Sequence, residues 1–158
     1  MKFALTSTGF IMPTHIDAIR ECGGELVGIN TKEDCVVVNS PNYLHYQHIK
    51  EHLDKIVLCE KPLVIDPEQA RELAQYNNVF TVLQLRYHPL LKQIEKKEMN
   101  NIQMDISFYR DQKYFDVWKG DEEKSGGILY NLGIHYLDLL FQLFGRPISC
   151  VGDYDDRT

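Results

Sequence analysis

Short apolar runs that alternate with helical patterns constrain the fold of this chain more than any other feature. Cys35–Asn39 and Lys55–Cys59 are nearly continuous apolar runs, typical of parallel strands that are buried on both faces. Helical patterns occupy residues 13–22, 43–53 and 67–75, before, between and after these two runs. Strand–helix alternation with apolar strands predicts an α/β fold with a largely parallel sheet.

The other elements follow from the same patterns and from turn residues. Asp66 is suited to cap the helix that starts at Pro67, and Gly23-Gly24 is suited to end the first helix. Further strands are predicted at 2–5, 26–30, 79–85, 102–109 and 148–154, further helices at 90–98 and 128–144, and a polar, aromatic loop at 112–125.

The composition is that of a globular protein, with 44% hydrophobic and 25% charged residues in a chain of 158. A formal net charge of −6 provides no basic surface for nucleic acid or an anionic membrane. No apolar run is long enough to span a bilayer, and polar residues with Pro13 interrupt the amino-terminal segment. The four cysteines lack zinc-site spacing. We therefore expect a cytoplasmic protein with reduced cysteines and no metal.

The first strand, a glycine turn and a helix resemble the opening unit of a dinucleotide-binding fold. There, a helix amino terminus presents N–H groups to a pyrophosphate. Only Gly9 of the glycine pattern is present, and Thr6 and Met12 occupy the flanking positions. Asn30 stands where an acidic residue would bind the ribose, about 20 residues further on. On this segment alone, an ordinary strand–helix turn is the favoured interpretation.

The connection between the second and third predicted strands is unusually short. Only residues 31–34 separate them, whereas a parallel crossover needs about a dozen residues. Four extended residues reach only about 14 Å. Either residues 26–30 and 35–39 form an antiparallel hairpin, or one of these strand predictions is wrong.

Three motifs in a fixed order resemble those of the Gfo/Idh/MocA oxidoreductase family. They are Ser40-Pro41-Asn42-Tyr43-Leu44-His45, then Cys59-Glu60-Lys61-Pro62, then Gly126-Gly127 followed by Asn131, Gly133 and His135. Within the family, the bacterial UDP-N-acetylglucosaminuronate 3-dehydrogenases are the most similar branch. The resemblance implies a reduced Rossmann-like domain over 1–89 and a truncated α/β region with an open sheet over 90–158.

The resemblance also implies functional residues, NAD as cofactor and a nucleotide-linked sugar acid as substrate. Lys61 and His135 would handle the proton of the reacting hydroxyl. Residues expected to line the cofactor are Gly9, Phe10, Ile11, Asn30, Ser40, Pro41, Asn42, His45 and Glu60. Residues expected near the substrate are Lys61, Arg86, His88, Trp118, Lys119, Asn131 and His135.

The chemistry of these side chains supports an alcohol dehydrogenase, but a second function stays open. Oxidising an alcohol requires a base for the hydroxyl proton, and Lys61 after a strand and a nearby histidine suit this need. The alternative is a catalytically inactive protein that binds a nucleotide sugar or a full-length relative, favoured by the missing glycine, acid and helix–strand unit. We also expect a homo-oligomer, because a short sheet exposes strand edges and apolar surface.

Overall fold

The computed structural model describes residues 1–94 and 101–151, and its amino-terminal part is a parallel sheet of five strands. The strands are β1 (Lys2–Leu5), β2 (Glu25–Leu26), β3 (Cys35–Val38), β4 (Ile56–Cys59) and β5 (Val79–Thr81). Their order is β2-β1-β3-β4-β5, and all four neighbouring pairs are parallel. The predicted Rossmann-like parallel sheet is therefore confirmed.

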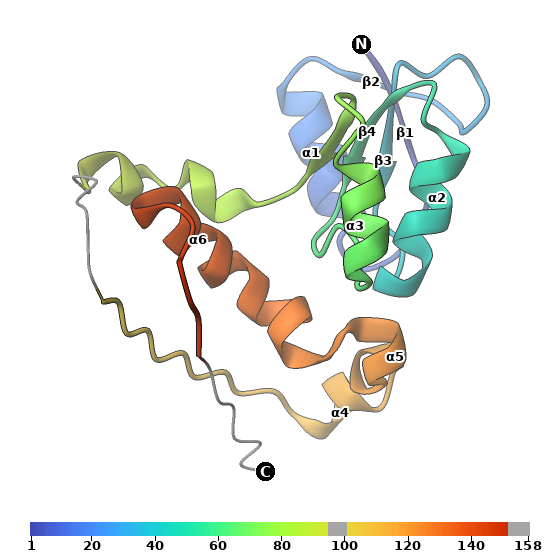
Figure 1. Cartoon of the computed structure of the whole chain (residues 1–158). Helices are drawn as coiled ribbons and strands as arrows, with labels where there is room; N and C mark the ends of the chain where they lie inside the picture. The colour runs from blue at the N-terminus through green and yellow to red at the C-terminus, as the bar shows by residue number, and fades with distance from the viewer. Residues whose placement is uncertain (95–100, 152–158) are drawn as a thin grey trace.

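Helices lie on both faces of this sheet. In Figure 1, α2 (His45–Glu51) and α3 (Pro67–Leu73) lie on one face, and α1 (Met12–Glu21) lies on the other. A 3₁₀ turn, η1 (Asn42–Leu44), leads into α2. The predicted helix signals are confirmed: the Asp66 carboxylate accepts a hydrogen bond from the Glu68 N–H at 2.8 Å, and Gly23 (φ 72°) follows α1.

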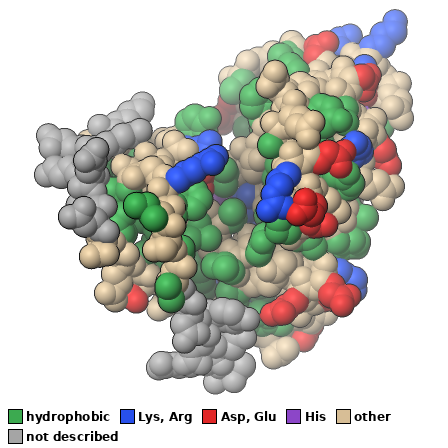
Figure 2. All heavy atoms as spheres, viewed as in Figure 1, with side chains coloured by type: hydrophobic (Ala, Val, Ile, Leu, Met, Phe, Trp, Pro, Cys, Tyr) green, Lys and Arg blue, Asp and Glu red, His purple; other side chains and the backbone are tan. Residues whose placement is uncertain are grey.

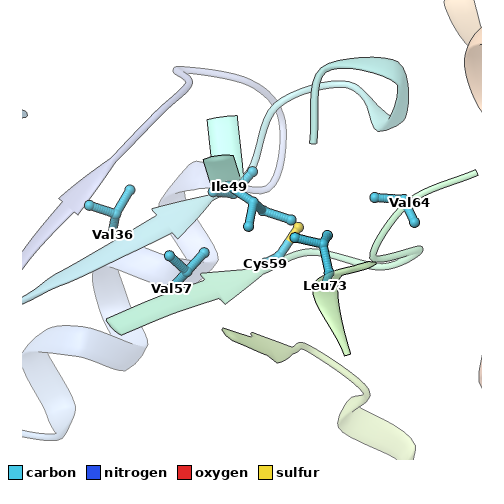
Figure 3. Packing of buried hydrophobic residues seen from close by; sticks show 7 residues of the cluster. Val36, Ile49, Val57, Cys59, Val64 and Leu73 are labelled. Carbon is cyan, nitrogen blue, oxygen red and sulfur yellow. The ribbon is translucent and has the colours of Figure 1, made fainter. Parts of the chain in front are cut away.

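The apolar run of β3 is continuous because both faces of this central strand are covered. Figure 3 shows side chains of β3 and β4 meeting α2 and α3, where Val36, Val57 and Ile49 have no exposed surface. The alternate residue Val37 is equally buried but lies outside this cluster. Each such side chain contributes roughly 1.5–3 kcal/mol to folding. This packing fixes the carboxyl ends of β3 and β4, where the motifs begin.

The connection from β2 to β3 corrects the sequence analysis. The predicted strand over 26–30 is too long, because β2 ends at Leu26 and leaves residues 27–34 for the connection. The antiparallel hairpin is wrong, since β2 and β3 lie on opposite sides of β1 and both run parallel to it. Two strand spacings total about 10 Å, which eight residues span easily.

The turn inside this connection is held by a buried acid. The Glu33 carboxylate, 4% exposed, accepts hydrogen bonds from the N–H groups of Asn30 at 3.2 Å and Thr31 at 3.0 Å. Asn30 and Lys32 have positive φ angles of 62° and 73°. A hydrogen bond from its own backbone N–H, together with these two, lowers the pKa of Glu33 although burial opposes the shift.

The second half of the chain is mainly helical. It comprises the 3₁₀ helices η2 (Gln84–Tyr87), η3 (Pro89–Gln93) and η4 (Trp118–Gly120), the α-helices α4 (Gln112–Phe115), α5 (Glu122–Ser125) and α6 (Ile134–Phe144), and the π-helix η5 (Leu129–Gly133). None of these or the earlier described helices has the length and hydropathy needed to cross a membrane. The predicted helix over 128–144 is confirmed, with a π-helical first turn.

Several predictions for the chain after residue 78 were wrong. The strand predicted over 79–85 ends at Thr81, and the loop over 112–125 contains α4, η4 and α5. Described residues of the predicted helix 90–98 form only η3, while 95–98 lie outside the description. Residues 102–109 and 148–151 form no strand, and 152–154 lie outside it.

The segment 101–111 nevertheless keeps one feature of a strand. Its side chains alternate in exposure from Met104 to Tyr109, and Phe108 packs against Tyr136 of α6 with ring centroids 5.7 Å apart. A strand needs a hydrogen-bonded neighbour, and the described residues supply none for this segment.

Candidate functional site

The candidate site lies at the carboxyl edge of the sheet, where the order of strands reverses. β1 is flanked by β2 and β3, so its carboxyl end marks the switch point at which such folds bind ligands. The Asn39 amide joins two loops there, because its oxygen accepts from the Ser7 N–H and its nitrogen donates to the Ser7 carbonyl, both at 2.9 Å. In Figure 1, α5 and α6 lie beyond this edge.

Lys61 and Asn131, 70 residues apart in sequence, meet directly in this site. Lys61 follows β4, and its ammonium group donates a hydrogen bond to the Asn131 carbonyl oxygen at 2.6 Å. Asn131 is 5% exposed and lies in η5, where the irregular π-helical turn departs from the α-helical hydrogen-bond pattern. Its side-chain amide donates to the Tyr114 hydroxyl at 2.5 Å. Parts of the second and third motifs are thus brought together.

The paired glycines of the third motif explain how η5 is positioned. Gly126 and Gly127 both have left-handed φ angles, 78° and 74°. A Cβ atom on Gly126 would lie 2.8 Å from Cβ of Tyr130 and 2.9 Å from a methyl carbon of Ile65. Glycine is therefore required by both the backbone conformation and the close approach. The turn carries the chain from α5 into the helix that bears Asn131.

His135 completes the group on the first turn of α6. Burial and the nearby Lys61 ammonium lower the pKa of His135, and its buried Nδ1 atom has no hydrogen-bond partner in the described residues. Burial, together with Lys119 and Arg110, also lowers the pKa of Lys61, although Glu60 opposes the shift. The site therefore holds two adjacent basic groups that release protons more easily than usual.

Glu60 is ionised by a partner that the sequence analysis missed. Its carboxylate lies 2.8 Å from Nε2 of His15, and both side chains are largely buried, with 15% and 11% exposed. Burial raises the pKa of Glu60, but the contact with His15 and the Lys61 N–H outweigh burial, so the net shift is downward. This pair joins α1 to the end of β4. His15 stands in the first helix, but no spacing in the sequence pointed to Glu60.

Two residues expected to line the cofactor, His45 and Asn42, hold the loops in place. The His45 ring has no exposed surface, and its two nitrogens lie 2.8 Å from the Ser40 and Pro62 carbonyl oxygens. Burial lowers the pKa of His45 despite these two contacts. Asn42, 5% exposed, donates to the Ser125 carbonyl at 2.8 Å. Because both ring nitrogens of His45 are engaged by carbonyl groups, this side chain holds the loop in place, and its contact with a cofactor stays a prediction. Ser40 and Pro41 lie in the same loop.

The β1–α1 turn, where the pyrophosphate of a dinucleotide is expected, is open to solvent. Phe10 is 96% exposed, and a Cβ atom on Gly9 would meet only the Ser7 hydroxyl, at 3.4 Å. Ile11 caps α1 without a side-chain hydrogen bond, but the Met12 N–H donates to the Gly9 carbonyl at 3.0 Å and Pro13 has no N–H, so the first turn offers few free donors to an anion. Asn30 lies beyond β2 in the turn held by Glu33, so its contact with a ribose stays a prediction.

The residues expected near the substrate are divided between two places. Arg86 makes a bidentate ion pair with Asp138 of α6, and the exposed His88 caps η3 through its ring nitrogen, 3.3 Å from the Leu90 N–H. Trp118 packs edge-on against Tyr43, with centroids 6.5 Å apart. Lys119, by contrast, is close enough to Lys61 to lower its pKa. Of these four residues, only Lys119 is therefore placed with Lys61, Asn131 and His135, and all the substrate roles stay predictions.

Two portions of the chain match the two domains of one oxidoreductase family. Residues 24–79 match the description "Oxidoreductase family, NAD-binding Rossmann fold", and residues 91–158 match "Oxidoreductase family, C-terminal alpha/beta domain". Both belong to the GFO_IDH_MocA group. The two matches follow each other in the order that the motifs predict.

Individual relatives agree with this assignment. The chain is 31% identical to D-glucoside 3-dehydrogenase of Escherichia coli K12 over 73% of its length and 37% of the relative. The Thermus thermophilus WlbA dehydrogenase, solved with NAD and UDP-GlcNAcA, is 30% identical with a TM-score of 0.77, covering 94% of this chain and 64% of that one. The Bordetella pertussis WlbA dehydrogenase, solved with NADH and UDP-GlcNAcA, is 26% identical with a TM-score of 0.79, covering 92% and 55%. The chain spans little more than a third of the curated relatives it matches first.

Proposed function

Because the chain belongs to the Gfo/Idh/MocA oxidoreductase family, we propose that it oxidises a hydroxyl group of a nucleotide-linked sugar acid with NAD as cofactor. One observation carries the proposal: the hydrogen bond from Lys61 to Asn131 joins the end of β4 to the helix that bears His135. Basic groups with lowered pKa values then gather at the switch point of an NAD-binding Rossmann fold.

In the proposed reaction, Lys61 and His135 manage the proton of the reacting hydroxyl. NAD, when bound, supplies the acceptor for the hydride. A lowered pKa gives Lys61 a larger neutral fraction, and its neutral amine can accept the hydroxyl proton as the carbon loses its hydride. His135 is suited to pass that proton onward, because burial favours its neutral form. The products are a ketone, the reduced cofactor and a proton.

Other residues would hold the participants. The open turn at Gly9 and Phe10 would bind the pyrophosphate at the start of α1. Asn131 would fix the Lys61 ammonium through its carbonyl, and the His15–Glu60 pair would fix the loop that carries Lys61. These groups orient the reacting atoms and take no part in the proton transfer.

The sugar-acid substrate rests on likeness to the WlbA dehydrogenases that were solved with UDP-GlcNAcA. The E. coli relative is named for a glucoside, which makes a simple sugar the competing substrate class. A negatively charged substrate suits a site in which Lys61, Lys119 and Arg110 are close together.

A second candidate function is binding of a nucleotide sugar without turnover. The short connection between β2 and β3 favours it, because Asn30 lies in the turn held by Glu33 and not at a strand end. That arrangement weakens the part of the fold that would bind the adenosine ribose.

Turnover measurements separate the two functions. Purified 158-residue protein should reduce NAD when supplied with UDP-N-acetylglucosaminuronate, and Lys61→Ala should abolish that reduction. Lys113→Ala, which removes an exposed lysine of α4, is the matched control and should keep the wild-type rate. Binding of the sugar without any NAD reduction would favour the second function.

We also propose that the protein forms a homo-oligomer. Large hydrophobic side chains are exposed on both halves of the molecule, as Figure 2 shows for one face, and include Phe80 (52%) on β5 and Phe141 (45%) on α6. The segment 101–111 also lacks a strand partner in the described residues. Such surfaces are usually covered. Light scattering that gives the mass of a single chain would contradict this proposal.

A further inference from the structure

Two cations lie over one aromatic ring beside the candidate site. The Arg110 guanidinium carbon is 5.4 Å from the centroid of the Tyr114 ring, and Nζ of Lys119 is 4.9 Å from it. Neither cation forms an ion pair within residues 1–94 and 101–151. Cation–π contacts position both groups without neutralising them.

Hydrogen bonds connect this ring to Lys61. The Tyr114 hydroxyl accepts from the Asn131 side chain at 2.5 Å, and the Asn131 carbonyl accepts from Lys61 at 2.6 Å. Lys119 and Arg110 are both close enough to lower the pKa of Lys61. Three positive groups from three segments therefore share one region of the site.

The neighbouring acids are committed elsewhere. Asp111 caps α4, Asp116 accepts from the Gln112 amide, and Asp121 pairs with Lys124. Glu60 partly compensates Lys61, but no carboxylate of the described residues pairs with Arg110 or Lys119, although the chain as a whole carries a net charge of −6. Uncompensated cations held on a rigid aromatic ring are typical of a place that receives an anion.

We propose that Arg110 and Lys119, held by Tyr114, bind an oxoanion of the substrate next to Lys61. The oxoanion is a carboxylate of the sugar or a phosphate of its nucleotide carrier, and both offer the acceptor oxygens that a guanidinium and an ammonium bind. This inference rests on the proposed function and assigns Arg110 a role that the motifs do not.

Calorimetric titration with three ligands tests the proposal and separates the two sources. The ligands are UDP-N-acetylglucosaminuronate, UDP-N-acetylglucosamine, which lacks the carboxylate, and UDP. Arg110→Gln and Lys119→Gln should each weaken binding by about tenfold, because each removes one charge-assisted bond. Loss for the uronate alone identifies the carboxylate as the bound group. An equal loss for all three ligands identifies the phosphates.

The control and the contradicting outcomes are equally specific. Lys113→Gln removes a positive charge from the exposed surface of the same α4 segment and should leave all three affinities unchanged. If Arg110→Gln and Lys119→Gln behave like Lys113→Gln, or if no ligand binds the wild-type protein at millimolar concentration, the inference is wrong. The titrations are made without cofactor, so a failure of NAD binding or turnover overturns the proposed function independently.

Discussion

Loss of the ion pair between Arg86 and Asp138 should destabilise the protein measurably. The pair is bidentate and joins η2, which follows β5, to α6 one turn beyond His135. The Asp138 side chain is 9% exposed and that of Arg86 42%. Removing one partner of a fully buried pair costs about 3–5 kcal/mol. Since Arg86 is partly solvated, Arg86→Met should lower the free energy of unfolding by about 2 kcal/mol.

Asp138→Asn should cost less, about 1 kcal/mol, because the partly exposed guanidinium can be solvated by water. If the two residues act only through each other, the double variant should lose about 2 kcal/mol, not the additive sum of about 3. Urea unfolding of the four proteins measures this coupling, and the melting temperature of Arg86→Met should fall by about 4–8 °C. Additive losses would refute the account of Arg86 as an anchor for α6. If Arg86→Met leaves the stability unchanged but weakens substrate binding, the predicted role of Arg86 at the substrate would be supported.

Three further predictions concern the glycine turn, the buried histidine and the core. Gly126→Ala should lower the free energy of unfolding by about 2 kcal/mol or more, because it adds a clash to a left-handed backbone. Gly23→Ala, which has open space around it, should cost only about 1 kcal/mol in urea unfolding. Equal losses for the two variants would contradict the close approach at Gly126. Burial lowers the pKa of His135 below 6.5, so the unfolded chain binds the proton more tightly than the folded protein. The free energy of unfolding should therefore fall as the pH drops below 6.5, and it should fall less in His135→Gln. Parallel curves of stability against pH for the two proteins would disprove this prediction. Ile49→Ala should lower the free energy of unfolding by about 2–5 kcal/mol, whereas Gln47→Ala, at an exposed position of the same helix, should lower it by less than about 0.5 kcal/mol. Similar losses for both variants in denaturant titrations would argue against the described core.

The sequence predicts the sheet well where local patterns and burial agree. All four residues of β3 are buried, so its apolar run marks it as a central strand, whereas β4 buries Val57 and Cys59 and leaves Ile56 exposed. Asp66 and Pro67 mark the start of α3 because capping depends on neighbouring residues alone. The path from Leu26 to Cys35 could not be predicted, because it depends on β1 lying between the two strands.

The site is predictable only in part for the same reason. The resemblance identifies Lys61 and Asn131, and the structure places them in direct contact. The roles of His15 and Arg110 were not predicted, since they depend on which segments the fold brings beside Glu60 and Tyr114. Long-range pairs of this kind leave no periodic signal in the sequence.

Titration of the 158-residue protein with NADH tests the central claim most directly. Trp118 is the only tryptophan and is placed in the segment next to Lys119, so energy transfer from its indole ring to the bound nicotinamide reports binding. The account predicts saturable quenching of Trp118 emission that NAD reverses by competition. An emission that stays unchanged up to millimolar NADH, with no heat of binding by calorimetry, would contradict the assignment of a working NAD site to this fold.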